Sequence, residues 1–157
     1  MLGLYSKVLE VLTLALLGSG ENGKNKIENM KILIFEGLHF LSNSILHGGG
    51  CMRIGYESEI INIIYYGIKI AWESKKEYEL IIQLLKCILG YLELENDILK
   101  SRNVSVMFLF RQTQMYNVIT EIYNCTKNKS LIEYSGLVLN EFDGNEEVDM
   151  DNKMSLI

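Results

Sequence analysis

Apolar residues along the chain fall into short runs that glycine and asparagine separate, since the sequence contains no proline. The run at residues 8–17 is nearly continuous and ends at Gly18, a pattern typical of a buried parallel strand. Short apolar runs at residues 105–110 and 135–140 also predict strands. These runs together predict a small parallel sheet.

Other segments carry apolar residues at helical spacing. In residues 27–41 one face holds Ile27, Met30, Ile34, Leu38 and Leu41. Residues 58–99 hold two further stripes, the first formed by Ile60, Ile63, Ile64, Gly67, Ile68 and Ala71, the second by Leu80, Leu84, Cys87, Ile88 and Tyr91. Residues 115–126 predict a last helix through Tyr116, Ile119, Ile122 and Tyr123.

The order of these elements predicts an α/β fold class, namely a reduced P-loop NTPase-like parallel sheet with an inserted all-helical region. Residues 1–34 and 100–145 would form the core, and residues 35–99 the insertion. Residues 146–157 would be an acidic, disordered tail. An all-helical fold stays open if each short apolar run is part of a helix.

The net charge of −5 is concentrated at one end of the 157-residue chain. Residues 141–157 hold Glu141, Asp143, Glu146, Glu147, Asp149 and Asp151 against Lys153 alone. The remaining body is electrically balanced, so it lacks the basic footprint of a nucleic-acid-binding protein.

The three cysteines are far apart and odd in number, which indicates reduced cytosolic thiols rather than disulfides or a zinc site. No apolar run reaches 18 residues, so no transmembrane segment is expected. Gly3 does not occupy position 2, so the sequence gives no N-myristoylation signal.

A candidate phosphate loop follows the first predicted strand. Gly18, Gly23 and Lys24 have the G-x-x-x-x-G-K spacing, with Asn25 where a serine or threonine hydroxyl is usual. A strand before such a loop and a helix after it would aim backbone N–H groups at phosphate. The competing interpretation is a glycine-rich turn that contains a lysine.

Further polar clusters are weaker candidates. The HGGG sequence at 47–50 resembles a lipase oxyanion loop, but G-x-S-x-G is absent, which favours a plain loop. His47 and Cys51 supply only two metal ligands, and His39 is interpreted as a helix-face residue. Asn140 and Asp143 would follow a buried strand, where α/β folds bind ligands.

Several fragments in a fixed order resemble heterotrimeric G-protein alpha subunits. These fragments are LALLGSGENGKNKIENMKIL at 14–33, IKIAWES at 68–74, EYEL at 77–80, DILKSRNVS at 97–105 and LVLNEFD at 137–143. The resemblance implies nucleotide contacts at Glu21, Asn22, Gly23, Lys24, Asn25, Leu99, Lys100, Ser101, Arg102, Asn140 and Asp143. It also implies Arg102 as the catalytic arginine finger and Asn25 and Ser105 as magnesium ligands.

By this resemblance the chain would be an alpha-subunit-like signal transducer that binds GTP or GDP with Mg²⁺. Weakened GTPase activity is expected, because Asn25 replaces a hydroxyl and the glutamine of the second switch is absent. A beta–gamma dimer and a receptor would be its protein partners, although their contact regions are largely missing, and its location would be the cytoplasm or the inner face of the plasma membrane.

Two alternatives remain open from the sequence. LLKCILGYLELENDILKS at 84–101 can form a helix–turn–helix of the armadillo or HEAT type, which would make the chain an all-helical protein-interaction module. A decayed gene product that keeps only fragments of a fold is the other alternative.

Overall fold

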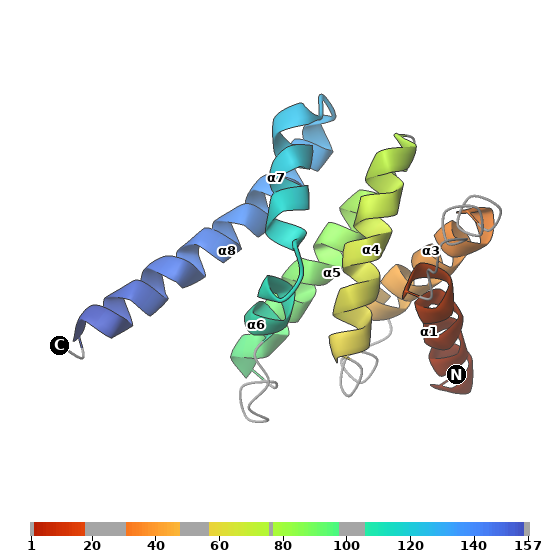
Figure 1. Ribbon diagram of the computed structural model, residues 1–157, viewed down its shortest axis with the longest axis horizontal. Helices are drawn as coiled ribbons and strands as arrows, with labels where there is room; N and C mark the ends of the chain where they lie inside the picture. The colour runs from red at the N-terminus through yellow and green to blue at the C-terminus, as the bar shows by residue number, and fades with distance from the viewer. Residues whose placement is uncertain (1, 18–30, 48–56, 76, 98–105, 156–157) are drawn as a thin grey trace.

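The computed structural model describes residues 2–17, 31–47, 57–75, 77–97 and 106–155, and its regular elements there are all α-helices (Figure 1). The helices are α1 (Leu2–Leu17), α3 (Lys31–His47), α4 (Glu57–Ser74), α5 (Tyr78–Asp97), α6 (Val106–Arg111), α7 (Met115–Cys125) and α8 (Lys129–Ser155). The predicted α/β fold with a P-loop-type parallel sheet is therefore wrong, since the described residues contain no strand.

The predicted strands are parts of α1, α6 and α8. Their buried residues lie three apart, as on one face of a helix: Leu9 and Leu12, Met107 and Phe110, Ser135 and Val138. The runs look continuous in the sequence because Leu14, Phe108 and Leu137 add apolar side chains on exposed positions. These exposed residues concealed the helical period.

The helical stripes that the sequence predicts within residues 58–99 are confirmed, because every member of both is buried. In α3 the predicted face is confirmed at Ile34, Leu38 and Leu41, while Ile27 and Met30 lie outside the described residues. The helical span of α8 continues to Ser155, through the part of the chain whose composition predicts disorder.

The helices pair into the hairpins α1–α3, α4–α5 and α7–α8, with the short α6 before α7. Each hairpin contributes one helix to each of two layers. Helices α1, α4 and the α6–α7 pair lie in one layer, and α3, α5 and α8 lie in the other (Figure 1). Each hairpin packs against the next, through α1 on α4, α3 on α5, α4 on α7 and α5 on α8. The helices of the second layer begin at residues 31, 78 and 129, a step of about 50 residues that resembles the spacing of helical solenoid repeats.

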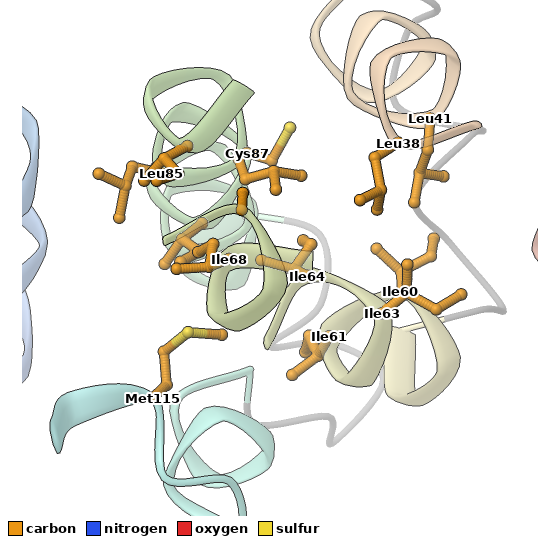
Figure 2. Packing of buried hydrophobic residues seen from close by; sticks show 14 of the residues in the cluster. Leu38, Leu41, Ile60, Ile61, Ile63, Ile64, Ile68, Leu85, Cys87 and Met115 are labelled. Carbon is orange, nitrogen blue, oxygen red and sulfur yellow. The ribbon is translucent and has the colours of Figure 1, made fainter. Parts of the chain in front are cut away.

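The core lies between the two layers and is richest around α4 and α5. Figure 2 shows Leu38 and Leu41 of α3 pointing toward Ile60 and Ile63 of α4. In the same view Met115 of α7 approaches α4 from the other side. Isoleucine has only moderate helix propensity, so α4 depends on this burial more than on its intrinsic preference for the helix.

Helices α3 and α4 approach closely at a glycine. A Cβ atom on Gly67 would lie 2.9 Å from Cδ2 of Leu38, which is fully buried against the α4 backbone. Between α3 and α5, the hydroxyl of the buried Ser42 donates a hydrogen bond to Gln83 Oε1 at 2.9 Å. These contacts fix how α3 sits against its two neighbours, because sliding it would separate both pairs.

We expect the far-ultraviolet circular dichroism spectrum of the purified chain to be that of a predominantly helical protein. The expectation follows from the absence of strands in the described residues and is checked by fitting the spectrum for helix and strand content. A large strand component would contradict the fold.

Replacing Leu38 tests the packing of α3. Leu38→Ala should lower the free energy of unfolding by about 2–5 kcal/mol, because it empties a fully buried position opposite Gly67. Leu33→Ala is the matched control on the same helix, since Leu33 is 57% exposed and its removal should cost at most about 0.5 kcal/mol. Urea denaturation followed by circular dichroism measures both; equal losses would show that α3 packs through a different face.

Candidate functional site

A cleft of about 670 Å³ lies where the C-terminal half of α4 faces α7. Its wall on one side comes from α4 and the turn into α5, and on the other side from α7. The residues that line it are Lys69, Trp72, Glu73, Lys75, Tyr78, Val118, Glu121 and Cys125. The cleft therefore joins two neighbouring hairpins of the stack.

The tight turn after α4 places two aromatic rings together. The backbone N–H of Lys75 donates to the carbonyl of Trp72 at 3.2 Å, and Lys75 has a φ of 61°. This left-handed residue ends α4 in the manner of a helix C-cap and turns the chain into α5. The rings of Trp72 and Tyr78 then lie 6.5 Å apart between centroids, inclined at 48°.

Both aromatic side chains are half-buried and rest on the hydrophobic core. Their inner portions are therefore held in place, while their remaining surface lines the cleft. Neither the indole N–H of Trp72 nor the hydroxyl of Tyr78 makes a hydrogen bond with a described group. These polar atoms are available to a molecule that enters.

The opposite wall follows from the amphipathic character of α7. Met115, Ile119 and Ile122 form its buried face, and the half-buried Val118 lies beside them at the cleft. Glu121 is exposed on the next turn. The apolar floor of the cleft thus continues from α4 to α7, with charges above it.

The cleft carries charges of both signs that do not neutralise each other by direct contact. Lys69 and Lys75 are basic, Glu73 and Glu121 are acidic, and all four side chains are exposed. None of them takes part in an ion pair within the described part of the chain. A partner could therefore form ion pairs here without breaking existing ones.

Most of the residues that the sequence singled out for nucleotide binding lie outside the described residues. This group comprises Glu21, Asn22, Gly23, Lys24, Asn25, Leu99, Lys100, Ser101, Arg102 and Ser105, and thus the expected arginine finger and magnesium ligands. Their roles, and with them the binding of GTP or GDP and of Mg²⁺, stay untested predictions. The described residues include no group of three or more histidine, cysteine or acidic side chains placed to hold a metal ion.

Asn140 and Asp143 are described, and their setting differs from the expected one. Both lie within α8 rather than after a buried strand, so they are not at the edge of a sheet. The hydroxyl of Tyr116 in α7 donates a hydrogen bond to Asp143 Oδ1 at 3.1 Å. Beside it, the rings of Tyr116 and Phe142 pack edge to face at 6.0 Å. Asp143 therefore helps to join α7 to α8.

The sequence matches no protein-family model, and neither the curated proteins nor the solved structures yield a match. The expected membership in the heterotrimeric G-protein alpha subunits is therefore wrong. The structure shows why, because the fragment at 137–143 lies in α8 and residues 14–17 of the fragment at 14–33 lie in α1, where that family would require strands. No helix among the described residues is long and apolar enough to cross a membrane.

Sequence reasoning missed the cleft residues because they come from different hairpins. Trp72 and Tyr78 lie on either side of a turn, and Val118 is far from both in the chain. The one available signal was Trp72, the single tryptophan, beside a lysine-rich turn without glycine. That signal gives no indication of the partner wall on α7.

Replacing Lys75 tests the turn that positions the two rings. Lys75→Gly should raise the free energy of unfolding by about 0.5–1 kcal/mol, since glycine adopts positive φ without the steric cost of a Cβ atom. Lys75→Val should instead lower it, because a β-branched residue is strained there. Chemical denaturation measures both variants, and a less stable glycine variant would contradict the left-handed turn.

Proposed function

We propose that this protein is a helical-repeat interaction module that binds a segment of another polypeptide in the α4–α7 cleft. The observation that carries the proposal is the cleft itself, with a tryptophan and a tyrosine on its floor and unpaired charges at its rim. The stacked hairpins serve as the scaffold that holds its two walls.

The architecture supports this function. Stacked helical hairpins form extended surfaces in which neighbouring repeats jointly line a groove, and such proteins commonly act by binding other chains. In this protein α4 and α7 are neighbours in one layer, and each rests on a helix of the other layer. Both walls of the cleft are therefore supported by helices of the other layer, α4 by α5 and α7 by α8.

The composition of the cleft also fits a polypeptide partner. Tryptophan and tyrosine are enriched among the residues that contribute most to protein–protein binding, because they bury a large area at low entropic cost. Trp72 and Tyr78 are already held by the core, which reduces the ordering cost of binding. A volume of about 670 Å³ accommodates a few side chains rather than a whole domain.

We further propose that the module acts in the cytosol. The described cysteines, Cys87 and Cys125, are both free thiols, and Cys125 is exposed beside the cleft. Exposed free thiols persist in reducing compartments and are oxidised outside them. The absence of disulfide cross-links among the described residues is in keeping with this location.

A displayed library of random peptides, selected against the purified chain, tests the function. Selected peptides should bind the unmodified protein in a fluorescence anisotropy assay, and Trp72→Ala should weaken them at least about tenfold, as expected of a central aromatic contact. Phe108→Ala is the control, because it also removes an aromatic ring, and Phe108 is 60% exposed and does not line the cleft.

Failure to select any peptide would argue against the proposal. Selected peptides that bind equally well to the Trp72→Ala variant would place the binding surface elsewhere on the molecule. Both variants must first give a helical circular dichroism spectrum and a cooperative melt above the assay temperature, because Trp72 packs on the core and its removal is expected to lower the melting temperature.

A further inference from the structure

We infer that the cleft selects an arginine side chain on the segment it binds, an inference that rests on the proposed function and specifies the chemistry of the partner. The guanidinium would lie against Trp72 and Tyr78, between the carboxylates of Glu73 and Glu121. The inference comes from the nature and placement of these groups in the cleft.

The aromatic rings favour a cation over an anion. The face of an aromatic ring carries negative electrostatic potential, most strongly in tryptophan, so it attracts a cation and repels a carboxylate or phosphate. At a separation of 6.5 Å and an inclination of 48°, the rings of Trp72 and Tyr78 form a corner rather than a stacked pair. A planar guanidinium can stack on the face of one ring while its edge contacts the other ring.

The two carboxylates come from opposite walls. Glu73 lies on α4 beside Trp72, and Glu121 lies on α7. Neither makes an ion pair with a described residue, although Lys69 and Lys75 line the same cleft. A guanidinium has five N–H donors in one plane and can serve carboxylates on two sides, whereas an ammonium group is a compact point charge.

Lys69 and Lys75 weaken the preference of the cleft for a cation but do not reverse it. Lys69 and Lys75 are exposed, and their long stems allow the ammonium groups to move into solvent when a cation enters. The same groups are able to pair with carboxylates that flank the arginine on the bound segment. The cleft therefore suits an arginine within a mixed-charge sequence better than a run of basic residues.

Titration with blocked amino acids tests the inference without a known partner. The probes are N-acetyl-arginine amide, N-acetyl-lysine amide, N-acetyl-glutamine amide and N-acetyl-glutamate amide. Because Trp72 is the single tryptophan, its indole N–H gives one resonance in a ¹⁵N-labelled sample that reports directly on the cleft. The arginine probe should shift this resonance in a saturable manner at millimolar concentration, more strongly than the lysine probe, and the glutamine and glutamate probes should have little effect.

A double variant separates the carboxylates from the rings. Glu73→Gln with Glu121→Gln should weaken the arginine probe about fivefold to tenfold, because two exposed ion pairs are lost. Glu36→Gln with Glu133→Gln is the matched control: it changes the net charge equally, and both residues are exposed outside the cleft. The control should bind arginine as the unmodified chain does.

Two outcomes would overturn the inference. One is a stronger response to the glutamate probe that depends on Lys69 and Lys75, and the other is equal arginine binding by the Glu73 and Glu121 double variant and the unmodified chain.

The peptide selection distinguishes these failures from a failure of the proposed function. Selected peptides that need Trp72 but contain no arginine would support the interaction module and would contradict the selection of arginine. An absence of Trp72-dependent peptides would reject the interaction module itself.

Discussion

The fold depends on the burial of one broad face of α5 against four other helices. The buried residues of this helix occupy successive positions as well as one stripe: Leu80, Ile81, Leu84, Leu85, Cys87, Ile88, Tyr91 and Leu92. They cover a broad face of α5, wider than a single stripe, so that face must pack against more than one neighbouring helix, while Glu79 and Glu93 on the other side are exposed. Helices α3, α4, α6 and α8 all contact α5, and this packing sets the order of the hairpins in the stack.

The candidate site follows from the same packing. When α4 packs on α5 and α7 packs on α8, the outer surfaces of α4 and α7 are brought next to each other without being fully joined. The short turn from α4 to α5 then brings Trp72 and Tyr78 to that place. The cleft is thus a product of hairpin stacking and not of a catalytic loop.

The sequence revealed the helices whose apolar residues form a long, buried stripe. It predicted α4 and α5 correctly, because their stripes are long and every predicted member is buried. It misassigned parts of α1, α6 and α8, because Leu14, Phe108 and Leu137 place apolar side chains in solvent and imitate a continuous strand. Periodicity cannot separate a short buried strand from a helix with apolar residues on its exposed side.

The site was less predictable than the fold. Short fragments in family order suggested a nucleotide-binding protein, but a fragment such as LVLNEFD has no fixed conformation of its own, and here it is helical. Asp143, expected to read a guanine base, accepts a hydrogen bond from Tyr116 instead. The cleft depends on the pairing of α4 with α7, which only tertiary packing determines.

The position of the cleft across two hairpins has a thermodynamic consequence. In a stacked-hairpin protein each unit is stabilised chiefly by its neighbours, so the α7–α8 hairpin can open before the rest of the core unfolds. Opening it separates Val118 and Glu121 from Trp72 and removes one wall of the cleft. A ligand that binds only the closed form at a hundred times its dissociation constant would add about 2.7 kcal/mol against this opening. Binding in the cleft and opening of the α7–α8 hairpin are thus thermodynamically linked, so a bound ligand makes the last two hairpins unfold more cooperatively.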